Sequence, residues 1–433
     1  MNNVPPGYKQ TEVGVIPEEW DVLPLSLITD PKRPIGYGIV QTGRRISNGV
    51  KCVRVVDFEN GQINSDDLIT TSPEISAAYK RTLLAEGDLL IALRGKIGEL
   101  AVIGKELIGA NLTRGVALLA PLSGYDSKYL SHYLSSPRGK QVFERNLNGS
   151  ALQEIPIATL RKIPAVVPPL PEQRAIATAL CDVDALLGAL DRLIAKKRDL
   201  KQAAMQQLLT GQTRLPGFHG EWEVKQLEQS CELITKGTTP TSIGRDFTEG
   251  GVNFLKAESI SESGEPLVDK VAFIDAATNI LLKRSQLKEG DLLISIAGVL
   301  GRVGRVSKEI LPANTNQALA LIRLANASEL ERDFLFYCLR SPMTTKQISD
   351  VNVQAAQANI SLQNVRDLEI RVPPTKTEQT AIAAVLTDMD AELTALEQRR
   401  EKTRALKQGM MQELLTGRIR LVEPRRTARG AAC

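Results

Sequence analysis

The sequence has few of the residues that usually build metal and catalytic sites. Among its 433 residues are only two histidines, His132 and His219, and neither lies in a cluster with metal-ligand spacing. The five cysteines form no C-x-x-C pair, which argues against a structural zinc ion or a disulfide framework and fits a reducing cytosol. We therefore expect no metal site and no histidine-based catalysis.

Motifs for nucleotides, methyl transfer and membranes are also missing. There is no G-x-x-x-x-G-K-[ST] loop for ATP hydrolysis. The glycines of 36–38 and 298–304 lack the dinucleotide-fingerprint spacing, and no N-P-P-Y motif of adenine methyltransferases occurs. The longest apolar runs, such as 291–301, are too short to span a membrane. The start of the chain has no apolar segment typical of a secretory signal. We expect a cytoplasmic protein that is not an enzyme by itself.

Composition allows several domains and a nucleic-acid partner. The length is enough for two to four domains, and 42% hydrophobic and 24% charged residues are typical of soluble globular proteins. The net charge of +4 permits binding to a nucleic acid, although domains that bind by charge alone are usually more basic.

One long segment occurs twice. Residues 172–215 and 378–421 align without a gap and are identical at 25 of 44 positions. The copies lie 206 residues apart, far more than the roughly 20–50 residues of a solenoid unit. The sequence is therefore a duplicated half-molecule, and two similar halves favour an internal pseudo-two-fold axis.

Each copy has the features of one long helix. Pro171 and Glu172 fit a first helical turn, and Thr375 stands three residues before Glu378, as in a capping box. Both copies end in Leu-Leu-Thr-Gly, which places a glycine where a left-handed residue commonly ends a helix. Apolar residues recur at the spacing of a coiled-coil seam. They are Ile176, Leu180, Val183, Leu187, Leu190 and Ile194 in the first copy, and Ile382, Leu386, Met389, Leu393 and Leu396 in the second.

Two arrangements of these helices are possible. Each helix could pack separately on its neighbouring domain. Alternatively the two helices could pair with each other, which their near-identity favours, and helices related by a two-fold axis would form an antiparallel coiled coil.

The segments between the helices repeat more weakly. Residues 49–54 match 251–256, and 86–91 match 289–294. Short apolar runs between Gly, Asn, Asp and Pro predict strands and turns, with helices near 127–147 and 329–351. The predicted fold class is α+β, with two similar domains joined by two long helices. The predicted division is 1–165 (first domain), 166–212 (first helix), 213–370 (second domain), 371–421 (second helix) and 422–433 (basic disordered tail).

This organisation resembles the specificity (S) subunit of Type I restriction–modification systems over nearly the whole length. The resemblance rests on the opening YKQTEVGVIPEEW (8–20), on two divergent domains, and on the helix after each domain, which has E-Q shortly after P-P and continues through I, L, D and L-K-Q to L-L-T-G. It implies a non-catalytic DNA reader for phage defence and DNA methylation. Each target-recognition domain would bind half of a split site in double-stranded DNA, and the helices would be the spacer and the docking surface for two methyltransferase subunits.

The resemblance also places the cofactors in other subunits. The methyltransferase subunits would use S-adenosylmethionine to methylate adenine, and restriction subunits, where present, would use ATP and Mg²⁺. No cofactor is expected in this chain. Two alternatives stay open: a coiled-coil scaffold or adaptor that does not read DNA, and the recognition subunit of a related methylation-only or phage-defence system.

A DNA reader needs basic side chains for phosphates and Arg, Asn or Gln for base edges. Such residues gather in the glycine-punctuated turns of both domains, where the alternative for each is a solvated charge or a capping amide. The DNA-binding candidates are Lys32, Arg33, Tyr37, Gln41, Arg44, Arg45, Arg54, Arg94, Lys96 and Arg114 in the first domain, and Lys236, Thr238, Thr239, Arg245, Lys256, Arg302, Asn314, Asn316 and Gln317 in the second. Asn111 and Asn314, which align with each other, could equally be structural turn residues.

Overall fold

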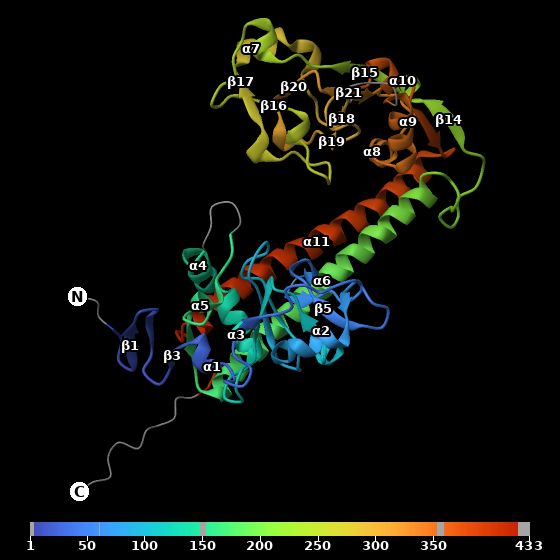
Figure 1. Cartoon of the computed structure of the whole chain (residues 1–433). Helices are drawn as coiled ribbons and strands as arrows, with labels where there is room; N and C mark the ends of the chain where they lie inside the picture. Colours follow the sequence, from blue (N-terminus) through green and yellow to red (C-terminus); the bar gives the residue numbers. More distant parts are fainter. Residues whose placement is uncertain (1–3, 60, 148–152, 353–358, 423–433) are drawn as a thin grey trace. The chain divides into compact units, whose positions relative to one another are not determined.

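The computed structural model describes residues 4–59, 61–147, 153–352 and 359–422. The chain forms two compact units (Figure 1). Unit 1 consists of Met1–Leu190 with Arg399–Cys433, and unit 2 consists of Asp191–Gln398. The predicted basic tail lies outside the described residues, apart from Val422.

Two four-stranded antiparallel sheets form the centres of the units. In unit 1 the order is β10-β9-β12-β4, and in unit 2 it is β15-β21-β18-β19. The strands are β4 (Gly36–Tyr37), β9 (Leu89–Ala92), β10 (Leu100–Val102) and β12 (Val116–Leu119), and β15 (Cys231–Lys236), β18 (Leu292–Ser295), β19 (Val303–Arg305) and β21 (Leu319–Leu324).

Each unit also has a three-stranded mixed sheet with one parallel and one antiparallel pair. The orders are β11-β5-β8 in unit 1 and β17-β16-β20 in unit 2. The strands are β5 (Val50–Val53), β8 (Ile69–Thr71) and β11 (Asn111–Leu112), and β16 (Val252–Leu255), β17 (Ala272–Ile274) and β20 (Ala313–Thr315).

Two-stranded antiparallel sheets complete the strand inventory of the described residues. The pairs are β1 (Tyr8–Thr11) with β2 (Gly14–Pro17), β3 (Asp21–Pro24) with β13 (Pro164–Val167), β6 (Phe58–Glu59) with β7 (Gln62–Ile63), and β14 (Glu223–Gln226) with β22 (Glu369–Val372).

The helices confirm the predicted patterns. The regions expected to be helical each contain two helices, and the long repeats each form one helix of 39 residues. The helices are α1 (Leu25–Ile28), α2 (Pro73–Ala78), α3 (Ser127–Ser135), α4 (Pro137–Arg145), α5 (Ile157–Leu160), α6 (Leu170–Leu208), α7 (Ala276–Leu281), α8 (Arg332–Leu339), α9 (Pro342–Asn352), α10 (Leu362–Arg366) and α11 (Lys376–Leu414). The long helices begin later than residues 166 and 371 because strands β13 and β22 end just before them.

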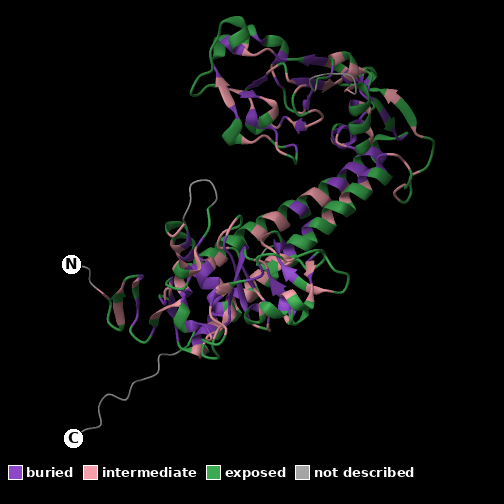
Figure 2. Cartoon of the chain, viewed as in Figure 1, coloured by how far each residue is buried: buried purple, intermediate pink, exposed green. Residues whose placement is uncertain are grey.

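The strand periodicity explains why the central sheets are apolar on both faces. Successive side chains of a strand point to opposite faces. In β9, Leu89 and Ile91 join a core with helix α3, whereas Leu90 and Ala92 join a second core with the three-stranded sheet. Strand β18 repeats this, with Leu292 and Ile294 on one face and Leu293 on the other. Figure 2 shows buried residues in these sheets and also on the helices.

Both long helices contribute to the core of each unit. In unit 1, Ile176 and Leu180 of α6 share a core with Met411 and Leu414 of α11. In unit 2, Ile382 and Leu386 of α11 share a core with Met205 and Leu208 of α6. The start of each repeat helix therefore packs with the end of the other. All eleven predicted seam residues are buried or half-buried.

Equivalent ion pairs join the long helices in both units, and in unit 2 they give the direction of the helices. In unit 1, Lys407 Nζ lies 2.6 Å from Asp184 Oδ1, and in unit 2 Lys201 pairs with Asp390. These residues are equivalent between the copies, because Lys201 aligns with Lys407 and Asp184 with Asp390. A second ion pair in unit 2 joins Lys197 Nζ to Glu392, at 2.6 Å. As residue numbers rise along α6 they fall along α11, so the two helical segments of unit 2 run antiparallel.

The long helices end at Leu208 and Leu414, before the predicted residues 212 and 421, but the predicted terminal glycines and the Thr375 cap are confirmed. Gly211 and Gly417 have φ of 74° and 72°, the left-handed conformation that glycine tolerates best. Thr375 Oγ1 accepts a hydrogen bond from Glu378 N at 3.3 Å, which confirms the cap. The Glu378 carboxylate, however, binds Arg214. The predicted reciprocal capping box is therefore wrong, because an arginine takes the carboxylate that would have completed it.

Candidate nucleic-acid interface

A close contact between two segments fixes the start of an exposed loop in each unit, residues 38–48 in unit 1 and 236–251 in unit 2, which we call the recognition loops. A Cβ added to Gly38 would lie 1.8 Å from the carbonyl oxygen of Leu112, and one added to Gly237 would lie 1.7 Å from that of Thr315. Only glycine fits such an approach. Ile39 N also donates to Leu112 O at 2.7 Å. Beyond these points, every residue of 43–48 and of 241–251 is exposed.

The structure brings several unit 1 candidates together around the contact between Gly38 and Leu112. Arg114 N donates to Ile39 O at 2.9 Å, so the turn that carries Arg114 borders the loop. Arg94 lies beside the same turn, because a Cβ added to Gly115 would be 3.0 Å from Arg94 Nε. Lys32, Tyr37, Gln41, Arg44 and Arg114 are exposed. Within the described residues, the side chains of Arg44 and Arg114 have no hydrogen bond or ion pair.

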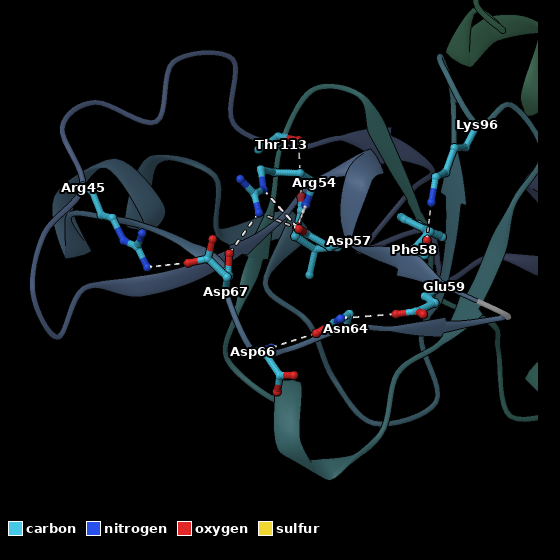
Figure 3. Close-up of polar contacts among 11 residues, drawn as sticks. Arg45, Arg54, Asp57, Phe58, Glu59, Asn64, Asp66, Asp67, Lys96 and Thr113 are labelled. Carbon is cyan, nitrogen blue, oxygen red and sulfur yellow. Dashed lines mark hydrogen bonds and ion pairs between the residues drawn. The ribbon is translucent and has the colours of Figure 1, made fainter. Parts of the chain in front are cut away.

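Other candidates in unit 1 are already paired with acidic groups or carbonyls (Figure 3). Arg45 Nη2 lies 2.9 Å from Asp67 Oδ1, and Arg54 Nη2 lies 2.7 Å from Asp57 Oδ1. Arg54 also donates to the carbonyl of Asp67, and hydrogen bonding to Asp57 raises its pKa. Lys96 Nζ donates to Phe58 O at 2.5 Å. A DNA phosphate would have to compete with these partners.

Arg33 has a structural role. Its guanidinium lies 2.6 Å from Asp88 Oδ2 and donates to Leu83 O at 2.7 Å. In unit 2 the equivalent Asp291 is bound by Arg323 at 2.6 Å, although Arg323 lies on β21 and not in the loop. Both carboxylates are nearly inaccessible, at 4% and 1% exposure. Arg33 therefore neutralises a buried acid, and its role as a DNA contact stays a prediction in which a phosphate would have to compete with Asp88.

Asn314 is also a structural residue. Its exposure is zero, as is that of Asn111. Asn314 Oδ1 accepts hydrogen bonds from Ser285 Oγ at 2.7 Å and Thr315 N at 2.8 Å, and its Nδ2 donates to Asn279 Oδ1 and Leu282 O. A base edge cannot reach an amide that is buried and fully bonded. The prediction of Asn314 as a DNA contact is wrong, and its structural alternative is confirmed.

The remaining unit 2 candidates lie along the second loop. Lys236 ends β15 and is exposed, and Arg245 is exposed in the loop. Lys256 Nζ lies 4.7 Å from the ring centre of Phe247, a cation–π contact.

The other five are anchored or half-buried to different degrees. Thr238, Thr239 and Asn316 are half-buried, while Gln317 is exposed and accepts a hydrogen bond from Thr239. Arg302 is half-buried and donates to the carbonyls of Ala257 and Ile260 at 3.2 Å, so it braces a turn.

The described residues contain no group of three or more His, Cys, Asp and Glu side chains that could hold a metal ion. No helix in the described part of the chain is long and apolar enough to cross a membrane.

Comparison with known proteins gives one family. Residues 38–196 and 219–405 each match the model of the Type I restriction modification DNA specificity domain. The EcoBI specificity subunit of Escherichia coli is 27% identical over 262 residues, which cover 58% of this chain and 50% of that protein. The MjaVIII specificity subunit of Methanocaldococcus jannaschii is 24% identical, with 80% of this chain and 82% of that protein covered.

A solved structure shares the fold. The crystal structure of the S subunit of a Type I restriction–modification system from M. genitalium matches with a TM-score of 0.58 and 15% identity, over 91% of this chain and 96% of that one. Two domain matches, in the same order as the two copies of the repeat, cover well over half of the sequence. The chain therefore belongs to the family of Type I restriction–modification specificity subunits.

Proposed function

We propose that this chain is the DNA-reading subunit of a methyltransferase complex and recognises a bipartite target, one half-site per unit. It has no catalytic role of its own. The observation that carries the proposal is the duplication of one recognition architecture: both units have the same pair of sheets, and both present a loop that starts at a glycine crossing.

The divergence of the loops supports separate half-sites. The first loop offers Gln41, Arg44 and Arg45, whereas the second offers threonines, Lys236 and Arg245. Hydrogen-bonding side chains determine which base edges a protein prefers. Two frames with the same topology and different loop chemistry therefore suit two different sequences.

The reciprocal contacts of the long helices support an antiparallel coiled coil with pseudo-two-fold symmetry. Asp184–Lys407 in unit 1 and Lys201–Asp390 in unit 2 are the same pair with the copies exchanged. Such an exchange is what a two-fold axis between the repeats would produce. In this proposal the helices hold the half-site readers at a fixed separation.

The outer face of α6 supports docking of partner subunits. Leu186, Leu193 and Leu200 are 40%, 39% and 47% exposed and recur every seven residues, so they form an apolar stripe on one side of the helix. Exposed apolar stripes of this kind commonly mark protein interfaces. We propose two methyltransferase subunits as partners, which would carry S-adenosylmethionine, with restriction subunits using ATP and Mg²⁺ in the same cytoplasmic assembly.

A domain exchange tests the proposal. Residues 20–165 are replaced by the equivalent domain of a family member with a different target, and methylated adenines are mapped in cells that express the complex. The expected result is one altered half-site and one unchanged half-site with the original spacing. A change in both halves would refute independent reading, and a wild-type complex with no sequence preference would favour the scaffold alternative.

A further inference from the structure

A basic dipeptide occurs at the same place in both units. Lys80–Arg81 aligns with Lys283–Arg284 at the spacing that also aligns 86–91 with 289–294. Each dipeptide begins a short 3-10 helix, residues Lys80–Thr82 in unit 1 and Lys283–Ser285 in unit 2. We call these the basic turns. Both units retain this dipeptide, although the loops around it differ between the units.

The cations of the basic turns are available to a ligand. All four side chains are exposed. Within the described residues, Lys80, Arg81 and Lys283 have no side-chain hydrogen bond or ion pair, and Arg284 donates only to the uncharged carbonyl of Lys236 at 3.3 Å. Arg45 and Arg54, in contrast, are paired with aspartates.

A buried amide holds each basic turn from both sides. In unit 1, Asn111 Nδ2 donates to the carbonyl of Tyr79, just before the dipeptide, and Asn111 Oδ1 accepts from Thr82, just after it, at 2.7 Å. In unit 2, Asn314 makes the same two bonds with Leu282 and Ser285, at 3.1 and 2.7 Å. The exposed cations are therefore presented from a rigid base.

Each basic turn also lies at, or directly after, an element that borders the recognition loop of its unit. In unit 1, helix α2 precedes the turn and borders the loop: a Cβ added to Gly43 would lie 3.1 Å from Ile75 Cδ1, and Thr71 Oγ1, just before the helix, donates to Thr42 O. In unit 2, Arg284 donates to Lys236 O, at the start of the loop. A duplex that lies on the loop would therefore pass close to the turn.

We propose that Lys80–Arg81 and Lys283–Arg284 are equivalent phosphate clamps that bind the backbone of double-stranded DNA beside each half-site. The inference rests on the proposed function. Phosphates are the same in every sequence, whereas base edges differ. Side chains that both units retain suit the phosphates, and side chains that diverge between the loops suit the bases.

Two turns elsewhere in the units provide a matched control. Lys105 and Lys308 are also equivalent, exposed and in short 3-10 helices, but each is followed by an exposed glutamate that offsets its charge. Lys105→Ala/Lys308→Ala removes two positive charges, as Lys80→Ala/Arg81→Ala does. The two variants therefore differ in the location of the lost charge and not in its amount.

The test measures the affinity of the full chain, assembled with its methyltransferase subunits, for a duplex with the mapped target across a KCl series. Lys80→Ala/Arg81→Ala should reduce the slope of log K against log salt by roughly 1.8, at about 0.9 for each lost phosphate contact, and should weaken binding on the order of tenfold near physiological salt. Lys283→Ala/Arg284→Ala should do the same. The methylated sequence should stay unchanged, and the exchange Lys80→Arg/Arg81→Lys should retain most of the slope.

The outcomes separate the clamp from the proposed function. An unchanged slope in the Lys80→Ala/Arg81→Ala variant, or an equal loss in the Lys105→Ala/Lys308→Ala control, overturns the clamp. A relaxed preference at one base position also overturns it, because it shows a base contact. If the wild-type complex has no sequence preference but the slope on random duplex still falls in the clamp variants, the clamp stands and the proposed function fails.

Discussion

Arg214 and Glu378 form a two-pronged ion pair in unit 2, with Nε and Nη2 of the arginine 2.7 and 2.6 Å from the two carboxylate oxygens. The equivalent pair in unit 1 is Arg420 with Glu172, at 2.5 and 2.7 Å. Each pair joins the arginine that follows one long helix to the glutamate at the start of the other. The glutamates are almost fully buried, at 1% and 2% side-chain exposure.

Removing Arg214 should strongly destabilise unit 2. Arg214→Ala leaves the buried Glu378 carboxylate without its counter-charge, which costs about 3–5 kcal/mol of the free energy of unfolding. The chain has two tryptophans, one in each unit, so Trp20→Phe leaves Trp222 fluorescence as a reporter of unit 2 in urea denaturation. Arg245→Ala is the control, because Arg245 is an exposed residue of unit 2 and its loss should change stability by less than about 0.5 kcal/mol. Equal stability of the Arg214→Ala and Arg245→Ala variants would contradict the prediction.

The ion pairs Arg214–Glu378 and Arg420–Glu172 show how much of the fold could be predicted from the sequence. Apolar spacing and caps predicted both long helices, because those signals are local. The pairing of Glu172 with Arg420 joins residues 248 positions apart, and no local pattern indicates it. The available signal was the retention of both residue types in both copies, and the same signal would have pointed to the basic turns.

The partners of the candidate DNA-contacting side chains could not be predicted, for a related reason. A list of basic side chains near glycines included Arg33 and Arg54, whose charges the structure pairs with Asp88 and Asp57. The partner of Arg33 lies 55 residues away in the sequence. Whether an arginine faces solvent or neutralises a buried acid depends on such distant partners, which composition and spacing do not contain.

We expect Asp67 to weaken DNA binding, because its carboxylate forms an ion pair with Arg45. The pair is solvent-exposed, at 65% and 78%, so it contributes little to stability. Asp67→Asn frees Arg45 and should raise DNA affinity several-fold, with a salt slope steeper by about 0.9 if one phosphate contact is gained.

Asp66→Asn is the matched control for this prediction. It removes the same charge from the neighbouring exposed residue, whose carboxylate is not bound to Arg45 (Figure 3). Fluorescence anisotropy on the target duplex measures both variants. Equal gains in affinity would show a general charge effect and not the release of Arg45.

His132 should make unit 1 less stable in mild acid. Burial lowers its pKa from 6.5 to about 4, partly opposed by Asp184 at 4.0 Å. The imidazole is therefore neutral at pH 7 and forms no ion pair there, while Asp184 pairs with Lys407. Below pH 6.5 the unfolded chain binds a proton that the folded chain does not, so stability is lost as the pH falls from 6.5 towards 4.

The size of this loss is measured as the difference in stability between the wild type and the His132→Gln variant at two pH values. At about 1.4 kcal/mol per pKa unit, the wild type should lose about 2–3 kcal/mol relative to His132→Gln between pH 7 and pH 4.5. Denaturant titrations at both pH values give the difference and cancel the contributions of the carboxylates. His219→Gln, at an exposed histidine, should retain the pH dependence of the wild type. A His132→Gln variant that loses as much stability as the wild type would contradict the prediction.

If the long helices are the ruler between the half-sites, their length sets the number of unread base pairs. The ion pairs dictate how the helices must be lengthened. Asp184 and Lys201 on α6 are 17 residues apart, as are Asp390 and Lys407 on α11. An insertion in one helix alone would put one pair out of register by the inserted length. Equal insertions after Leu190 and Leu396, which are equivalent positions, leave all four partners matched.

Four residues inserted at both positions should lengthen the spacing between the half-sites. They add roughly 6 Å at about 1.5 Å per residue, and about 400° of helix, which is some 40° beyond a full turn. One base pair of B-DNA supplies about 35° of twist, since a turn holds about 10–10.5 pairs. We therefore expect methylation mapping to show the same half-sites with a longer gap, one extra pair being favoured. The insertion in α11 alone should lose stability and activity, because Lys407 would no longer face Asp184. An active double-insertion variant with an unchanged gap would show that the helices are a docking surface and do not set the spacing.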